Sequence, residues 1–126
     1  MRKYRPAGEK PLHWAGSSRK DLLGFPDDVV ENIGYALGVV QYGGHPPSAK
    51  PWKGLGPGVH EIVESDEAGA FRAVYTVQFR KAVYVVHAFQ KKSPSGVRTA
   101  RTDVDLIKDR LRSAKTDYEE RYGKET

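Results

Sequence analysis

The sequence predicts an α+β fold, in which a small, mainly antiparallel sheet carries an N-terminal helical hairpin on one face and is followed by a C-terminal helix. Three observations lead to this prediction. Between Val59 and Ser93, three strand-like runs follow one another and are joined by short turns, which is the pattern of an antiparallel meander. Residues 18–41 and residues 102–122 instead carry apolar side chains at helical spacing. A chain of 126 residues has room for one such domain with a single core.

Composition limits the possible functions. The chain has 21 Lys and Arg against 16 Asp and Glu, a net charge of +5, which favours an anionic partner such as nucleic acid or an acidic protein segment. It has no cysteine, which excludes disulfides and thiolate metal sites and is typical of a reducing compartment. No apolar run approaches the roughly 20 residues of a membrane span, and no hydrophobic signal core is present. We therefore expect a soluble cytoplasmic protein.

The chain begins with a basic segment. Residues 1–10 contain Pro and Gly and show no periodicity, so we expect a flexible arm, then one domain over residues 11–122 and a frayed tail at residues 123–126. Leu12 and Trp14 alternate with His13 in a short strand candidate at the start of the domain.

Two helices come next in the chain. A capping box at Ser18–Asp21 predicts the start of a short helix that Gly24 ends. A second helix begins at Pro26, whose fixed backbone angle suits a first turn, and runs to about Gln41. Side chains at 3- and 4-residue spacing form its predicted buried stripe: Val29, Val30, Ile33, Leu37 and Val40.

The segment Gly43–Gly58 is rich in Pro and Gly, so we expect an irregular loop. Its glycines do not form a phosphate-binding loop, because a strand rather than a helix follows and the Gly-Lys-Ser/Thr motif is missing. Lys50, Trp52 and Lys53 place an aromatic ring among cations, an arrangement that suits the stacking of a base. A tryptophan in a loop more often closes the edge of the core, and we favour this interpretation.

The hairpin around Arg80 and Lys81 sets the register of the last two strands. A two- or four-residue loop there pairs Arg72 with Phe89 and Tyr75 with Val86. Because paired residues share a face, one face is predicted to collect polar side chains: Arg72, Thr76, Gln78, His87, Phe89 and Lys91. The other face is apolar and is predicted to receive the helices: Phe71, Tyr75, Val77, Phe79, Tyr84, Val86 and Ala88.

The last helix is predicted from about Thr102, which opens a second capping box with Asp105, to about Tyr122. Its apolar stripe is predicted to be core or a partner contact: Val104, Ile107, Leu111, Ala114 and Tyr118. Its outer surface is predicted to be basic: Arg101, Lys108, Arg110, Arg112 and Lys115.

Few residue patterns in the chain carry chemistry. The four histidines lack the spacing of metal ligands, and neither a nucleophile elbow nor a catalytic carboxylate pair is present, so we expect no metal and no cofactor. A cationic group remains at one end of the sheet, formed by Arg72, Lys91 and Lys92, with His87 nearby. Cations bind a phosphate and stabilise the charge that develops on it during transfer, and a histidine or lysine can move protons. Alternatively, Arg72 forms a structural salt bridge and the lysines only solvate a strand end.

The order of the predicted elements, with AFRAVYTV at Ala70–Val77 and VVHAFQKKS at Val85–Ser93, resembles the RelE/ParE superfamily of toxins from type II toxin–antitoxin systems. Within this superfamily the sequence looks like the HigB-like, phage-derived branch. The resemblance covers roughly Pro11 to Arg112, and Glu61 after the Lys-Gly-Leu-Gly loop also fits the pattern of that branch.

This resemblance implies a compact RelE-like toxin domain and metal-independent cleavage of mRNA on the translating ribosome, in which the 2′-hydroxyl attacks the adjacent phosphate and translation is inhibited. It implies a cognate antitoxin, expected to be a small helix-turn-helix protein that covers the basic face, with the ribosome and mRNA as further partners and no membrane. The implied catalytic residues are Arg72, Lys91, Lys92 and His87. The implied substrate-binding residues are Lys53, Glu61, Gln90 and Arg98.

One feature of the resemblance is missing. Many relatives use a tyrosine or histidine near the C-terminus for catalysis, and Tyr118 and Tyr122 fall too late in the last helix to be clear counterparts. Two other functions therefore stay open. One is a ParE-like toxin that poisons DNA gyrase without nuclease activity, and the other is a non-catalytic nucleic-acid-binding module.

Overall fold

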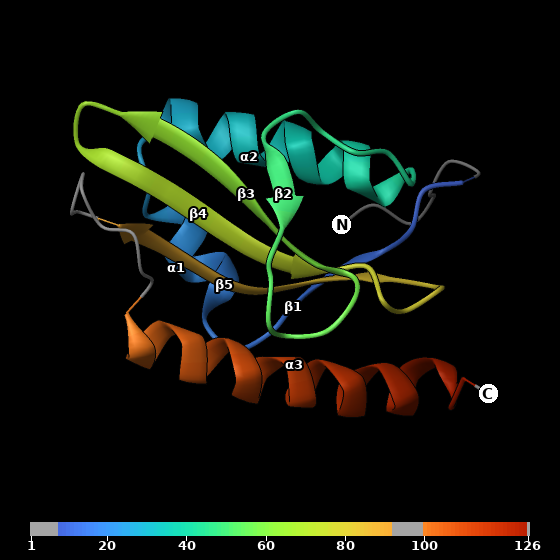
Figure 1. Cartoon of the computed structure of the whole chain (residues 1–126). Coiled ribbons are helices and arrows are strands. Elements are labelled where there is room, and N and C mark those ends of the chain that lie inside the picture. The colour runs from blue at the N-terminus through green and yellow to red at the C-terminus, as the bar shows by residue number, and fades with distance from the viewer. Residues whose placement is uncertain (1–7, 92–99, 126) are drawn as a thin grey trace.

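The fold is a five-stranded sheet with helices on both faces, as seen in a computed structural model that describes residues 8–91 and 100–125 (Figure 1). The strands are β1 Leu12–Trp14, β2 Ala49–Pro51, β3 Val59–Asp66, β4 Gly69–Thr76 and β5 Val83–Lys91. The helices are α1 Ser18–Leu23, α2 Asp27–Gln41 and α3 Arg101–Tyr122. The strand order is β1-β5-β4-β3-β2, in which β1 runs parallel to β5 and all other pairs are antiparallel. The predicted α+β class, the meander and the three helices are confirmed.

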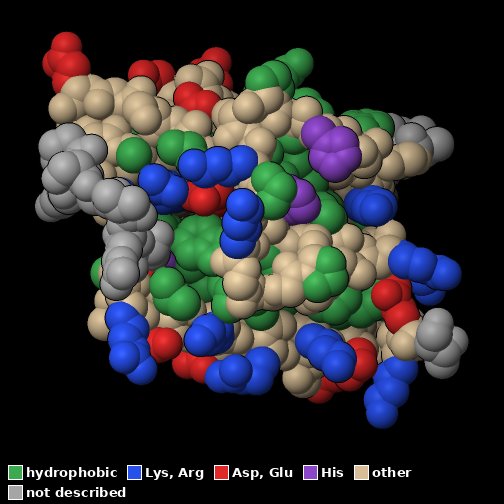
Figure 2. Space-filling view, viewed as in Figure 1, with side chains coloured by type: hydrophobic (Ala, Val, Ile, Leu, Met, Phe, Trp, Pro, Cys, Tyr) green, Lys and Arg blue, Asp and Glu red, His purple; other side chains and the backbone are tan. Residues whose placement is uncertain are grey.

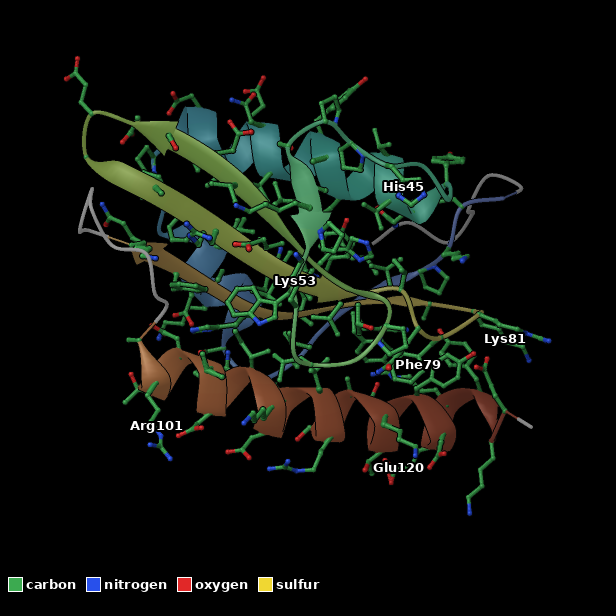
Figure 3. All side chains as sticks on the ribbon, in the orientation of Figure 1. His45, Lys53, Phe79, Lys81, Arg101 and Glu120 are labelled. Atoms are coloured by element: carbon green, nitrogen blue, oxygen red, sulfur yellow. The ribbon has the colours of Figure 1, made fainter. Side chains whose placement is uncertain are left out.

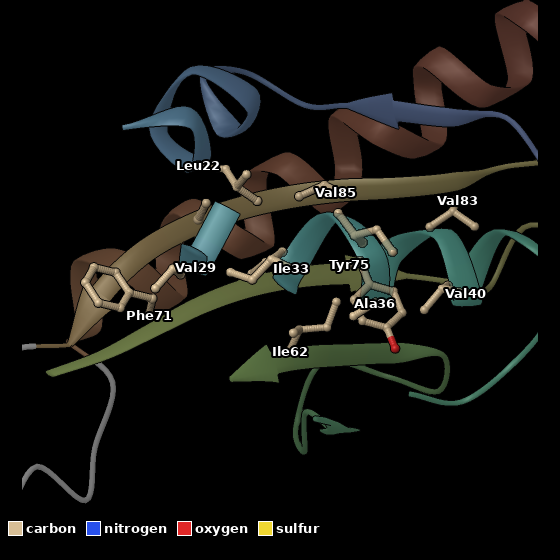
Figure 4. Close-up of a cluster of buried hydrophobic side chains, with 13 residues drawn as sticks. Leu22, Val29, Ile33, Ala36, Val40, Ile62, Phe71, Tyr75, Val83 and Val85 are labelled. Atoms are coloured by element: carbon tan, nitrogen blue, oxygen red, sulfur yellow. The ribbon is translucent and has the colours of Figure 1, made fainter. Parts of the chain in front are cut away.

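One face of the sheet is covered by α1 and α2 (Figures 1 and 4). The predicted stripe of α2 is the reason, because four of its five residues are buried and Val30 packs against the same cluster. They meet the sheet at Ile62, Phe71, Tyr75 and Val85. Burying each such side chain contributes roughly 1.5–3 kcal/mol. This layer is the main hydrophobic core.

The opposite face is covered by α3. Arg72, His87, Phe89 and Lys91 share this face as predicted, but the prediction that the face is polar is wrong where apolar side chains meet α3. A second apolar cluster fills the space between the sheet and α3. Trp52 and Leu55, from the loop after β2, pack against this cluster, so the tryptophan closes the core as the favoured interpretation had it. The cluster consists of Ala15, Val59, Val74, Phe79, Ala82, Tyr84, Val86, Ile107, Ala114 and Tyr118.

A β-bulge in β5 explains why the predicted faces were partly wrong. Arg72 pairs with Phe89 as predicted, but the register shifts after Val74, so that Tyr75 pairs with Val85 rather than Val86. One extra residue in a strand reverses the alternation beyond it. Tyr84 and Val86 therefore belong to the cluster on the α3 side and not to the α2 side that was expected. Phe79, which lies beyond the end of β4, packs in the same cluster. Gln78, which was predicted on the polar face of the sheet, lies beyond the end of β4.

Neither predicted capping box forms. The N-cap residues are Ser17 for α1 and Ala100 for α3, and neither makes a side-chain cap hydrogen bond. The Ser18 hydroxyl instead donates to the Val85 carbonyl at 3.1 Å and ties α1 to β5. Tertiary contacts thus replace local capping at the start of α1.

The segment predicted as a fully irregular loop contains β2, which pairs with β3 at the edge of the sheet. An edge strand tolerates Pro51 because one row of its backbone groups needs no partner strand. At the other edge, β1 forms as predicted, with Leu12 and Trp14 against the α2-side core. Of the predicted basic arm, residues 1–7 lie outside the described residues, and Lys10 exchanges hydrogen bonds of 2.8 Å with Gln41.

Candidate functional site

The candidate site centres on Arg72, in the middle of β4 on the face that α3 partly covers. Its guanidinium Nη1 forms an ion pair with Glu61 of β3, and the two side chains are only 15% and 9% exposed. The strand register brings them together, because Arg72 pairs with Val63, two residues after Glu61 on the same face. The buried Arg72 Nε has no hydrogen-bond partner among the described residues. This N–H is thus a buried donor for which the described residues provide no acceptor.

Other cations surround this pair. Lys50 of β2 lies opposite Glu61 in the sheet, and Lys91 lies opposite Ala70, two residues before Arg72. Paired and alternate residues share a face, so Lys50, Arg72 and Lys91 all belong to the face that carries Glu61. Figure 2 shows Lys and Arg side chains gathered around an acidic side chain over β3 and β4. The site has an excess of positive charge that suits a phosphate.

The loop between β2 and β3 adds Lys53 to this region. Lys53 is exposed, and it lies where the loop after β2 passes in front of the sheet (Figure 3). Its neighbour Trp52 is only half-buried against the second cluster. The loop therefore presents a cation beside an aromatic ring, as the sequence suggested.

His87 of β5 is buried and fully engaged. Its Nε2 lies 2.8 Å from Asp103 Oδ1, and its Nδ1 lies 3.4 Å from Nη1 of Arg110. Because Arg110 can only donate, Nδ1 acts as the acceptor, and the N–H at Nε2 donates a hydrogen bond to the Asp103 carboxylate. The ring also stacks on Phe89, with centroids 4.8 Å apart. In this arrangement the histidine holds α3 and the Phe89 ring in place, and both of its nitrogens are occupied.

Arg110 was predicted to lie on the outer surface of α3, and this prediction is wrong. Its guanidinium reaches inward to the Val86 carbonyl at 3.1 Å and the Ser17 hydroxyl at 3.0 Å. The position three residues after buried Ile107 was the available signal, since such residues border the buried stripe. No pattern in the sequence indicated that Asp103 contacts His87, which lies 16 residues earlier in β5.

The remaining predicted site residues are not all brought together. Gln90 donates to the Ala68 carbonyl at 2.8 Å, across the β3–β4 turn. Lys92 and Arg98 lie outside the described residues. The structure thus groups Arg72 and Glu61 with Lys91 and with Lys50, which the sequence suggested only as part of the base-stacking loop. His87 lies in an adjacent structural network.

At the other end of α3, a polar cluster fastens the helix to the sheet. The Tyr84 hydroxyl donates to Asp117 at 2.5 Å, and Arg121 donates to the same carboxylate at 2.7 Å. Burial opposes ionisation of Asp117, but these hydrogen bonds outweigh it and lower the pKa of Asp117 below its ordinary value. Burial, then the bond to Asp117, raise the pKa of Tyr84. The two groups therefore stay carboxylate and phenol near neutral pH.

Two features are absent from the described residues. Within residues 8–91 and 100–125, no group of three or more His, Asp or Glu side chains is placed to hold a metal ion. In the same part of the chain, no helix is long and apolar enough to cross a membrane.

Comparison with known proteins identifies the family. The model of the phage-derived Gp49-like family (DUF891) matches residues 20–112, well over half of the chain. No curated protein matches the sequence. A solved structure, the RelBE2 toxin–antitoxin complex of Mycobacterium tuberculosis, is similar with 14% identity and a TM-score of 0.47, covering 71% of this chain and 100% of that one. The Gp49-like family is itself RelE-like, whereas the HigB-like branch stays a prediction. The chain belongs to the Gp49-like family of phage-derived proteins.

Proposed function

We propose that this protein is the toxin of a toxin–antitoxin pair and acts as a metal-independent, ribosome-dependent mRNA endoribonuclease of the HigB-like type. Membership of a RelE-like family supports the toxin class. Cleavage would occur by attack of an RNA 2′-hydroxyl on the adjacent phosphate, which restricts the substrate to RNA. Loss of intact mRNA would stop translation.

The observation that carries this proposal is the unused donor of Arg72. A buried guanidinium N–H without a partner costs free energy, so its persistence supports a role for Arg72 beyond a structural salt bridge. A phosphate oxygen is a suitable acceptor, because phosphate matches the fork of guanidinium donors. Lys50 and Lys91, on the same face, would add positive charge around it.

The reaction requires one group to accept a proton and another to donate one, and residues in and beside the ion pair can supply both. The 2′-oxygen forms a bond to phosphorus and loses its proton, while the bond from phosphorus to the 5′-oxygen breaks and that oxygen gains a proton. Because Glu61 contacts Arg72, a phosphate held by Arg72 lies near its carboxylate, which can accept the first proton. Arg72 and Lys91 stabilise the extra negative charge on the phosphorane. Within this proposal, Lys91 and Lys92 are the candidates for returning a proton to the leaving oxygen.

RNA would extend from this point over the loop after β2. Lys53 would contact the backbone and the exposed part of Trp52 would stack a base. Gln90 and Arg98 remain candidates for further backbone contacts. His87 acts in this proposal as a positioning residue, because its two nitrogens bind Asp103 and Arg110.

The partners follow from the same charges. The basic face around Arg72 suits an acidic segment of a cognate antitoxin, expected to be a small helix-turn-helix protein that covers it. The ribosome and its mRNA are the proposed targets, which places the action in the cytoplasm.

Induction of the protein in cells, with mapping of mRNA 5′ ends, tests the proposal. The wild type should generate new 5′ ends within translated frames, and Lys91→Ala and Arg72→Ala should each reduce cleavage at least about 100-fold, the usual effect of removing a group that stabilises developing charge. Arg112→Ala, which removes an exposed cation of α3, is the matched control and should cleave normally. Thermal melts of the variants establish that they are folded.

Other outcomes would reject the proposal in favour of a stated alternative. Ongoing translation with failed DNA supercoiling would indicate a ParE-like gyrase poison. Harmless expression with nucleic-acid binding that weakens steeply with salt would indicate a non-catalytic module. Unchanged cleavage in both Arg72→Ala and Lys91→Ala would disprove the site assignment.

A further inference from the structure

The outer surface of α2 carries an exposed stripe that the proposed function does not use. Asp28, Glu31, Tyr35, Gly38 and Tyr42 recur at 3- and 4-residue spacing, so they lie along one line of the helix. This line faces away from the buried stripe of α2, which packs on the sheet. The N-terminal half of the exposed line is acidic and the C-terminal half is aromatic.

The aromatic half is unusually exposed. Tyr35 is 78% and Tyr42 is 56% exposed, and with Leu23 they are the large hydrophobic side chains left open to solvent in the described part of the chain. Between the two tyrosines lies a mainly apolar groove of about 460 Å³, lined also by Gly38, Val39 and Gly44. Exposed apolar surface of this kind is typical of a protein contact.

Two glycines, Gly34 and Gly38, leave part of this helix surface without side chains. A Cβ atom built at Gly34 or at Gly38 would meet nothing within 4 Å, so neither glycine is required by internal packing. Each costs about 1 kcal/mol of helix stability relative to alanine. Their absence of side chains leaves room for another element to approach the α2 backbone closely.

The charge of this surface is opposite to that of the chain as a whole. Helix α2 contains no Lys or Arg, and Asp27, Asp28 and Glu31 are all exposed. Beside them, Glu64 of β3 accepts a hydrogen bond of 3.2 Å from Asn32. Figure 2 shows acidic side chains along the upper edge of the molecule, where Figure 1 places α2 and the β3–β4 turn. A chain of net charge +5 thus presents one acidic helix surface.

We infer that the outer surface of α2 docks a basic amphipathic helix of a partner protein. Apolar side chains of that helix enter the groove between Tyr35 and Tyr42, and its Lys or Arg side chains pair with Asp28 and Glu31. A second copy of this chain fits less well, because it would bring the same acidic surface and a like net charge. The surface lies on the opposite side of the sheet from Arg72, so this docking is separate from the proposed cleavage.

A pair of labelled peptides tests the inference on the full-length chain. Both are 18-residue designed helices with one leucine stripe, flanked by lysines in the first peptide and by glutamates in the second. By fluorescence anisotropy, the lysine peptide should bind at least about tenfold more tightly than the glutamate peptide, and rising salt should reduce the difference. Equal affinity for the two peptides, or no binding of the lysine peptide at millimolar concentration, would overturn the inference.

Matched variants locate the binding on α2. Tyr35→Ser with Tyr42→Ser, and Asp28→Lys with Glu31→Lys, should each weaken binding of the lysine peptide at least about tenfold. Asp109→Lys, an acidic position on the outer surface of α3, should have no such effect. Light scattering tests whether a second copy of the chain occupies the surface instead. If the wild type were a dimer and the double tyrosine variant a monomer, the occupant would be a second copy, and the inference of a basic partner would be refuted. These variants should still cleave mRNA, so failure here leaves the proposed function intact.

Discussion

At the scale of single residues, the pairing of Arg72 with Glu61 decides the character of the candidate site. The two charges lie in a mostly buried position, where each is costly without the other. The Arg72 Nε adds an unpaired buried donor. Under the proposed function, the ion pair with Glu61 fixes the position of the guanidinium that binds the anionic ligand.

The stability of variants at Glu61 reports on this pair. Glu61→Ala leaves the Arg72 charge buried without a partner and should lower the free energy of unfolding by about 3–5 kcal/mol. Glu61→Gln keeps an acceptor and should cost clearly less. Urea denaturation measures both values.

The exposed ion pair of Asp109 and Arg112 on α3 provides the comparison. Asp109→Ala should change the free energy of unfolding by no more than about 0.5 kcal/mol. If Glu61→Ala changed the free energy of unfolding as little as Asp109→Ala, the ion pair of Arg72 and Glu61 would be solvated, and Arg72 would not carry a buried charge.

At the scale of elements, Arg110 joins α3 to β5 and to the start of α1. Its three hydrogen-bonded contacts reach Val86, His87 and Ser17. Gly16 lies directly beneath the guanidinium, because a Cβ there would stand 2.6 Å from Arg110 Nε, and its φ of +53° is in the left-handed region. The positive φ favours glycine at this position, and a Cβ would in addition displace the Arg110 guanidinium from its hydrogen bonds.

Replacement of this glycine tests the junction. Gly16→Ala should destabilise the fold by roughly 1–3 kcal/mol through backbone strain and displacement of Arg110. In an Arg110→Ala background the clash is gone, so the same replacement should cost about 1 kcal/mol less. A double-mutant cycle measured by urea denaturation gives the coupling, and strictly additive values would contradict the proposed junction.

The C-terminal part of α3 should be sensitive to acid. The folded state lowers the pKa of Asp117, so the carboxylate stabilises the fold above its ordinary pKa and loses this effect as pH falls through the lower, folded value. Asp117→Asn should therefore reduce the free energy of unfolding near pH 7, and the difference from wild type should shrink below about pH 4.

Chemical denaturation at a series of pH values measures this difference. Asp105→Asn, at an exposed ion pair near the start of α3, is the control for the loss of a carboxylate from the same helix. A difference between wild type and Asp117→Asn that stayed constant down to pH 2.5 would argue against the hydrogen bonds of Tyr84 and Arg121 as its cause.

At the scale of the whole molecule, the sheet separates two surfaces of opposite charge. The face that α3 partly covers holds Arg72 and its neighbouring cations, whereas α2 on the other side presents acids and tyrosines. Because the packed sheet lies between them, each surface can be changed without direct contact with the other.

We therefore expect that changes to the α2 surface do not alter the effect of the Arg72 surface on cell growth. The variant carrying Tyr35→Ser and Tyr42→Ser should inhibit growth on induction as the wild type does, because neither side chain touches the Arg72 site. Lys91→Ala should relieve the inhibition. Growth curves after induction, with protein levels checked by immunoblotting, measure both effects, and loss of toxicity in the tyrosine variant at normal protein level would contradict this separation.

Local patterns in the sequence determined much of this structure. The stripe of α2 and the alternation at Leu12–Trp14 are set by neighbouring residues. Periodicity of this kind is visible without the fold, because the period belongs to the element itself. The candidate residue Arg72 was found in the same way. The pairing of Arg72 with Phe89 was predicted from a two- or four-residue hairpin, but it arises from a longer connection between Thr76 and Val83 together with the bulge.

Only the tertiary structure decided which side chains lie on each face of the sheet and which helix they contact. The bulge after Val74 turned Tyr84 and Val86 towards α3, and packing against α3 drew Asp103 and Arg110 onto His87. These contacts join segments distant in the chain, so no local pattern encodes them. A one-residue shift of register reverses every side chain beyond it, and the burial gained against α3 selects which register is stable.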